Sequence, residues 1–227
     1  MQQTALNLIA IAIFLMTLSV LLGPFLHIPP SVPAIATFSV LAFLTADRFG
    51  WQGKGVTLLV DTVARFSPEH RDRVLRHEAG HFLTAYHLDI PILGYDLTAW
   101  EALKSGQSGI GGVRFNIEAL LREKEAGDRQ LFCDRFCTVW MAGIAAETLT
   151  YQQAEGGGDD RQKVTDTLVL LGYPARESRN KQQWGLLQAK SLLEKHEDTY
   201  EELVKAMAQR TPVEECYRIL AGEKVES

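Results

Sequence analysis

The chain contains little cysteine and carries little net charge. Three of its 227 residues are cysteine, an odd and small number that does not make a disulfide framework. The formal net charge is -5, and the chain has no basic stripe to neutralise phosphates, which argues against a nucleic-acid partner. Cys133 and Cys137 are one helical turn apart, and no further Cys or His flanks them. We therefore expect small buried thiols here rather than a metal pair.

Lysine and arginine are absent from the first 47 residues. Residues 5–22 form an apolar run without charge, a Gly/Pro-rich turn follows, and a second apolar run ends at Ala46. Since a helix of about 20 apolar residues crosses a bilayer, residues 1–48 are predicted to form a transmembrane helical hairpin. A cleaved signal peptide fits poorly, because the N-terminus has no positive charge and the run is too long. A hairpin buried in a soluble fold is the other alternative.

Positive charge begins directly after the second apolar run. The first basic residues are Arg48, Lys54, Arg65, Arg71, Arg73 and Arg76. Because basic residues accumulate on the cytoplasmic side of membrane proteins, residues 49–227 are predicted to form a separate domain that faces the cytoplasm. In an organelle this would be the equivalent compartment.

No run after the hairpin could span a membrane, and the pattern there favours a mainly α domain with a small β-sheet. Ser67, Pro68 and Glu69 have the order of an N-cap and first turn, which predicts a helix continuing to about His87. The remaining expected elements are strands within residues 92–100 and 109–117, a polar loop at 101–108 between them, and helices at 128–151, at 159–171 and within 177–225.

Residues 75–87, "LRHEAGHFLTAYH", contain an HExxH pattern. Residues four apart on a helix are only about 40° apart around its axis, so the imidazoles of His77 and His81 can reach one cation. Zn²⁺ is the usual occupant of such a pair, completed by a carboxylate or third imidazole and a water. Glu78 is placed to accept a proton from the water that zinc activates, which is the chemistry of HExxH peptidases.

Neighbouring residues refine this hypothesis. A glycine inside a helix costs about 1 kcal/mol relative to alanine, so Gly80, beside the small Ala79, predicts close approach of another backbone. His87 has the spacing of a third ligand in HExxHxxGxxH proteins, but that pattern needs glycine where this chain has Thr84. We interpret His87 as a solvated or core-edge histidine. Glu101 is a conceivable ligand, although no helix is expected to orient it.

The favoured third ligand is in "EGGGDD", directly before a predicted helix. The structural explanation is a flexible loop with an aspartate N-cap. One aspartate would satisfy that explanation, and there are two. We assign the capping role to Asp159 and the metal to Asp160, with the glycines letting the loop come close to the HEAGH helix.

Four motifs in this order, HEAGH, GIGGVRF, MAGIAAE and GGGDD, resemble the peptidase domain of FtsH, a family of membrane-anchored ATP-dependent zinc proteases. The resemblance extends over most of residues 63–171. It implies an FtsH-peptidase-like helical fold, with His77, His81 and Asp160 as zinc ligands and Glu78 as catalytic base. It also implies that GIGGVRF is an edge strand that pairs with an extended substrate.

The sequence departs from the FtsH pattern in several places. No GxxxxGK[ST] motif occurs in the 227 residues, whereas FtsH carries an ATPase module. Ile144 stands where the family usually has arginine, which puts helix packing or subunit contacts in doubt. Asp159 stands where the family has asparagine. Glu147 is either a residue that orients a ligand histidine or a structural buried acid.

The expected function is therefore a membrane-anchored, ATP-independent zinc metalloendopeptidase that cuts unfolded or membrane-protein segments. Partners would be the membrane, a polypeptide substrate, and a separate ATPase, FtsH-like subunits or a second copy. The resemblance favours a plasma or thylakoid membrane, with the catalytic domain in the cytoplasm or stroma. The alternative is an inactive assembly or chaperone-like factor with a retained peptide-binding fold. An intramembrane protease is excluded, because the charges at residues 69–76 cannot lie in hydrocarbon.

Overall fold

The computed structural model describes residues 2–51, 53–106, 111–116 and 129–222. The chain divides into two compact units. The first unit comprises residues 1–68 with 98–111, and the second comprises residues 69–97 with 112–227. The described part is mainly helical with one small sheet, which confirms the predicted fold class at this level.

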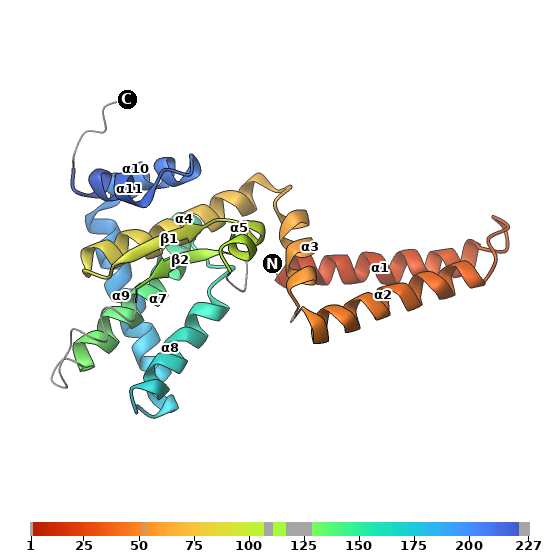
Figure 1. The fold of residues 1–227 in the computed structure, drawn as a ribbon, viewed down its shortest axis with the longest axis horizontal. Coiled ribbons are helices and arrows are strands. Elements are labelled where there is room, and N and C mark those ends of the chain that lie inside the picture. The colour runs from red at the N-terminus through yellow and green to blue at the C-terminus, as the bar shows by residue number, and fades with distance from the viewer. Residues whose placement is uncertain (1, 52, 107–110, 117–128, 223–227) are drawn as a thin grey trace. The chain divides into compact units, whose positions relative to one another are not determined.

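The first unit contains the two predicted apolar helices, α1 (Gln2–Leu22) and α2 (Ser31–Gly50), which form a hairpin (Figure 1). Both are long and apolar enough to cross a membrane. Almost none of either helix is buried within the chain, unlike the core helix of a soluble protein. The structure therefore disfavours a hairpin buried in a soluble fold.

A short amphipathic helix, α3 (Lys54–Ala64), follows the hairpin and was not predicted. The buried carboxylate of Asp47, on α2, accepts hydrogen bonds from two backbone N–H groups of α3. These bonds measure 2.7 Å from Gly55 N and 3.1 Å from Val56 N. A Cβ on Gly55 would lie 2.7 Å from Asp47 Oδ1, so glycine is required for this approach. The carboxylate thus satisfies N–H groups that the first turn of a helix leaves without a partner.

We expect Asp47→Ala to loosen the start of α3, because both N–H groups lose their acceptor. The cost is about 1 kcal/mol, as for other helix caps. Hydrogen–deuterium exchange of Gly55 and Val56 in the full chain would measure it. Asp47→Asn keeps one acceptor oxygen and should give a smaller increase in exchange, and unchanged exchange in both variants would contradict the capping role.

The second unit is built around α4 (Pro68–His87), whose bounds agree with the prediction. The long helix α7 (Arg129–Tyr151) packs against it. Among the described residues, the other helices of this unit are α8 (Gly158–Leu170), the 3-10 helix η1 (Ala175–Glu177), α9 (Ser178–Lys195), α10 (Glu197–Ala208) and α11 (Val213–Leu220). Gly172 follows α8 with a φ of 84°, which confirms that this glycine ends the helix.

The sheet has two antiparallel strands, β1 (Ile92–Asp96) and β2 (Gly112–Phe115). Both lie within the predicted segments, but β1 ends earlier than expected. Ala99–Lys104 forms a short helix, α5, where the continuation of the strand and a polar loop were predicted. The reason is a local N-cap, since Thr98 Oγ1 accepts a hydrogen bond of 2.9 Å from Glu101 N. Residues 107–110 and 117–128, which include parts of the predicted loop, strand and helix, are outside the described residues.

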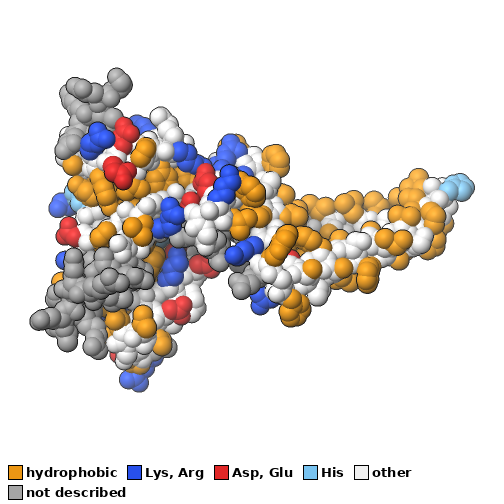
Figure 2. Space-filling view, in the orientation of Figure 1, with side chains coloured by type: hydrophobic (Ala, Val, Ile, Leu, Met, Phe, Trp, Pro, Cys, Tyr) orange, Lys and Arg blue, Asp and Glu red, His pale blue; other side chains and the backbone are white. Residues whose placement is uncertain are grey.

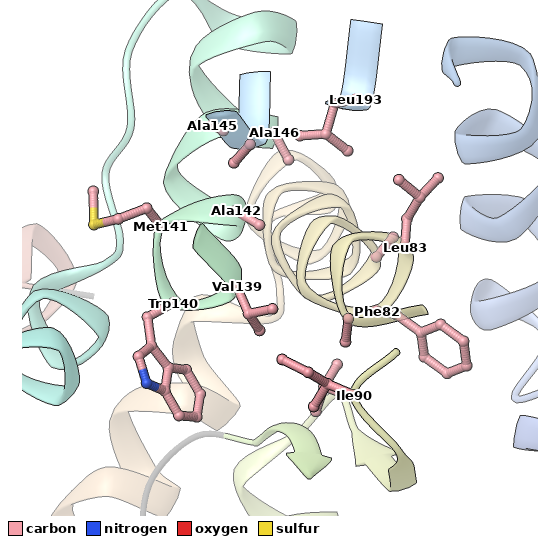
Figure 3. Packing of buried hydrophobic residues seen from close by; sticks show 14 of the residues in the cluster. Phe82, Leu83, Ile90, Val139, Trp140, Met141, Ala142, Ala145, Ala146 and Leu193 are labelled. Carbon is pink, nitrogen blue, oxygen red and sulfur yellow. The ribbon is translucent and has the colours of Figure 1, made fainter. Parts of the chain in front are cut away.

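Small residues let α4 and α7 approach at backbone distance. A Cβ on Gly80 would lie 2.7 Å from the carbonyl oxygen of Ala142 and 2.8 Å from Ala146 Cβ. Figure 3 shows Ala142, Ala145 and Ala146 on the side of α7 that faces α4. The predicted close approach at Gly80 is thereby confirmed. It brings α7 into hydrogen-bonding range of the two histidines on α4.

Candidate metal centre

His77 and His81 lie one turn apart on α4, and Asp160 approaches them from the first turn of α8. Asp160 Oδ2 is 3.0 Å from His77 Nε2 and 3.5 Å from His81 Nε2. One ligand atom from each of the three residues lies within 4.8 Å of the other two, so the group could hold a metal ion. The residues predicted as metal ligands are thus brought together from two helices and a sequence separation of 83 residues.

Helix α7 fixes the second nitrogen of each histidine. His77 Nδ1 is 2.7 Å from Glu147 Oε1, and His81 Nδ1 is 2.7 Å from the carbonyl oxygen of Val139. With both Nδ1 atoms held by acceptors, both Nε2 atoms are turned toward Asp160. Metal-binding histidines in proteins are commonly oriented in this way, by a carboxylate or a backbone carbonyl.

Glu147 itself is buried and fully engaged, which bears on the alternatives that the sequence left open. Its Oε2 accepts a hydrogen bond of 2.9 Å from Glu155 N, and the guanidinium of Arg73 lies 3.7 Å away. Glu147 therefore joins the α4 histidine to the loop before α8. Burial raises the pKa of Glu147, but the hydrogen bond and charge of His77 together with backbone N–H groups of Glu155 and Gly156 outweigh this and hold it below its usual value.

The electrostatics of the group favour positive charge. Burial alone would lower the pKa of His77, yet its hydrogen bonds with Asp160 and Glu147 and the nearby charge of Glu78 raise it to about 10. Burial alone would raise the pKa of Asp160, but His81 and His77 hold it far below its usual value. Carboxylates that stabilise a protonated imidazole would stabilise a divalent cation by the same attraction.

The loop before α8 can approach the histidines because of its glycines. A Cβ on Gly156 would lie 2.9 Å from Glu147 Oε1, and one on Gly157 would lie 2.2 Å from Ile144 Cγ1. Gly157 also has a φ of 87°, which an L side chain rarely adopts. The expected contact between this loop and the HEAGH helix is confirmed. Ile144 packs against Gly157.

Asp159 does not have the predicted capping role. Helix α8 begins at Gly158, the residue before it is Gly157, and no side chain caps this end. The prediction was wrong because the left-handed glycine lets the helix start earlier, so that Asp159 occupies the first turn and is exposed. An acidic residue there still interacts favourably with the helix dipole.

Lys163 is a contact of the centre that the sequence reasoning missed. Its Nζ is 3.0 Å from Asp160 Oδ1 and 4.8 Å from the centre of the Trp140 ring. Asp160 Oδ2 therefore faces the histidines, and Oδ1 faces Lys163. The i, i+3 spacing from Asp160 is the only signal in the sequence, and it is too common to identify a partner.

Glu78, the predicted base, is buried beside His77 and contacts the sheet. Its Oε2 accepts a hydrogen bond of 3.0 Å from Val113 N on β2. Gly111 and Gly112, with φ values of 132° and 148°, let the strand begin at this point. Because the Val113 N–H bonds Glu78, it points away from β1. The carboxylate therefore lies at the outer edge of β2.

The other candidates from the sequence do not belong to this group. Within the described residues, His87 is half-buried and stacks on His196 with ring centres 3.9 Å apart. Glu101 is on α5, in the first unit. Cys133 and Cys137 are buried free thiols 3.8 Å apart, as expected, and belong to no such ligand group among the residues described.

We expect Glu147→Gln to weaken metal binding about 10–100-fold, the usual effect of losing a group that orients a ligand. Only one acceptor oxygen remains for His77 Nδ1 and Glu155 N, and the charge is lost. A competitive zinc titration measures the affinity. Glu155→Gln is the control, because that side chain is exposed and its backbone N–H is retained. Equal affinity for Glu147→Gln and the wild type would make Glu147 a purely structural acid.

Comparisons with family models, with curated proteins and with solved structures find no match for this chain. The fold and the site define a mainly helical protein with two helices apolar enough to span a membrane and a His–His–Asp group that could hold a metal ion. Its function is therefore argued from the site.

Proposed function

We propose that this protein is a membrane-anchored zinc metalloendopeptidase that acts without an ATPase of its own. The observation that carries the proposal is the convergence of His77, His81 and Asp160, with Glu78 beside them at the edge of β2. The three possible ligands come from two helices, and Glu78 is adjacent in sequence to one of them. Any one of them alone would have an ordinary structural explanation.

The donor set fits Zn²⁺. Catalytic zinc sites have three protein ligands and keep one position open, and imidazole and carboxylate are common among these ligands. The two Nε2 atoms and the carboxylate of Asp160 supply such a set, and the remaining imidazole nitrogens are already hydrogen-bonded. When bound, zinc acts as a Lewis acid that lowers the pKa of water to about 7.

Glu78 would accept the proton of the attacking water. A general base must lie within hydrogen-bond reach of the proton that it removes, and Glu78 is adjacent in sequence to the ligand His77. Its contact with Val113 N, at the outer edge of β2, supports this role, because a peptide added to β2 would run along the same edge. An extended substrate that paired with this edge would pass beside the carboxylate.

The substrate class is proposed from the motifs that these 227 residues contain. The 227 residues contain no GxxxxGK[ST] motif, so the proposed substrates are unfolded polypeptides or segments of membrane proteins, free or delivered by a separate ATPase or FtsH-like subunits. The hairpin of α1 and α2 would be the anchor. The basic residues after α2 favour a domain in the cytoplasm or stroma.

Zinc content and cleavage of an unfolded protein by the full chain in lipid nanodiscs test this proposal. We expect about one zinc per chain, as for one site of three protein ligands, together with cleavage. Asp160→Asn should lose both, whereas Asp159→Asn, with an exposed side chain one residue away, should keep both. Zinc without cleavage would overturn the peptidase and favour the assembly-factor alternative. Wild-type chain that binds no zinc would overturn the site.

A further inference from the structure

Beyond the metal centre, the first unit carries an exposed apolar surface that the proposed chemistry does not use. It comprises Trp51, Leu59, Val63, Phe66 and Trp100, here called the α3–α5 patch. Phe66 is 81% exposed and Trp100 is 57% exposed, although aromatic side chains of this size are usually largely buried. Residues Leu58, Leu59, Thr62, Val63 and Trp100 line a shallow groove of about 410 Å³ within it.

Hydrogen bonds to two buried aspartates connect the α3–α5 patch to the α1–α2 hairpin. Asp47 on α2 binds the first backbone N–H groups of α3. Asp61 on α3 is buried, and its Oδ2 accepts a hydrogen bond of 3.0 Å from Ala99 N, the first residue of α5. Two buried aspartates thus connect α2, α3 and α5 in series, and the position of the patch relative to the end of α2 is fixed.

The direction of α3 places the patch at a membrane surface. Within the first unit, α3 runs across the end of the hairpin, where α1 begins and α2 ends, rather than extending it (Figure 1). If α1 and α2 cross the bilayer, a helix across their end lies along its surface. Figure 2 shows hydrophobic side chains covering most of the hairpin.

The composition of the region also fits a lipid interface. Tryptophan and other aromatic residues concentrate at the level of the headgroups, and lysine side chains extend from there toward water and phosphate. Lys54 begins α3, and Lys104 Nζ lies 5.3 Å from the centre of the Trp100 ring. Asp47 and Asp61 are buried and therefore do not repel anionic lipids, which leaves the half-buried Glu101 as the acidic side chain of these helices nearest the surface.

We propose that the α3–α5 patch lies in the headgroup region of the bilayer, with α3 as an interfacial helix whose occupant is phospholipid. The inference rests on the membrane anchoring in the proposed function, but not on peptidase activity. It means that α3 leaves the hairpin along the membrane surface.

A single reporter dye tests this inference in the full chain. The three native cysteines are buried, so a thiol-reactive, polarity-sensitive dye should label only a cysteine introduced on the surface. Leu59→Cys puts the dye on the α3–α5 patch, and Leu187→Cys, on α9 in the second unit, is the water-exposed control. Ile13→Cys, on the exposed side of α1, reports separately whether the hairpin is inserted.

After reconstitution into vesicles, we expect the dye at Leu59→Cys to emit at a shorter wavelength than in water. Lipids that carry a quencher near the headgroup should remove most of this emission. The dye at Leu187→Cys should respond to aqueous iodide instead. Iodide quenching at Leu59→Cys equal to that at Leu187→Cys overturns the inference, because the patch is then in water. Protection from both quenchers also overturns it, since protein then covers the patch. If Ile13→Cys, in the middle of α1, also escapes quenching by lipids that carry the quencher deep in the acyl chain, the membrane anchor itself fails.

Discussion

Replacing Glu78 with glutamine is expected to abolish peptide hydrolysis and leave metal binding nearly unchanged. Glutamine has the same shape and can still accept the hydrogen bond from Val113 N through its amide oxygen, so the local structure is preserved. It cannot take a proton from water. Because a general base contributes on the order of 10²–10⁴-fold to the rate, kcat should fall by at least about 100-fold.

The measurement is cleavage of an unfolded fluorescent protein by the full chain, with zinc content determined on the same samples. Glu69→Gln makes the same chemical change on the same helix, at an exposed side chain paired with Arg73, and should behave as wild type. An exposed ion pair contributes little to stability. Wild-type turnover in Glu78→Gln would remove Glu78 from the reaction and, with it, the peptidase chemistry assigned to the HExxH pattern.

The fold of the helices that carry the site could be predicted because their ends are marked locally. Helix α4 begins at Pro68 and ends at His87, shortly before Pro91, and Gly172 follows the end of α8. Helices α3 and α5 were missed for the opposite reason. They are short, and each is stabilised by a carboxylate from another helix, Asp47 on α2 for α3 and Asp61 on α3 for α5, in addition to the Thr98 cap of α5. Such support depends on tertiary structure and leaves no periodic pattern in the sequence.

The candidate site also contains some residues that could be predicted from the sequence and others that could not. Side chains with a chemical signature, His77, His81 and Asp160, could be selected from their spacing and their neighbours. The groups that orient them could not. The carbonyl oxygen of Val139 carries no residue-specific signal, and the position of Lys163 depends on how α8 packs against α7. Gly80 could be interpreted correctly, because a glycine inside a helix requires an explanation.

The second large effect is expected from a single methyl group at Gly143, on α7. A Cβ there would lie 2.3 Å from His77 Nε2 and 2.5 Å from its Cε1, so the imidazole lies directly against this glycine. The ring cannot move aside freely, because Glu147 holds Nδ1 and Asp160 lies 3.0 Å from Nε2. Gly143→Ala must therefore turn the ring or push α4 away from α7.

We expect Gly143→Ala to reduce zinc affinity by at least about 100-fold, since the ligand atom itself is displaced. It should also destabilise the fold by about 1–3 kcal/mol, as overpacking in a dense core does. A competitive zinc titration and thermal unfolding measure the two effects. Gly158→Ala is the matched control, because a Cβ there meets nothing within 4 Å although the residue is in the same site.

The sign of the Gly143→Ala effect on stability shows whether the His77 imidazole is held against α7. By intrinsic propensity, alanine in the middle of a helix is favoured over glycine by about 1 kcal/mol, so α7 would become more stable if the imidazole could move aside without cost. Lower stability together with lost zinc binding would show that Gly143 is kept small for the His77 imidazole. Higher stability with wild-type zinc affinity would mean that the ring is not held between α7 and Asp160, and His77 would no longer be a supported ligand.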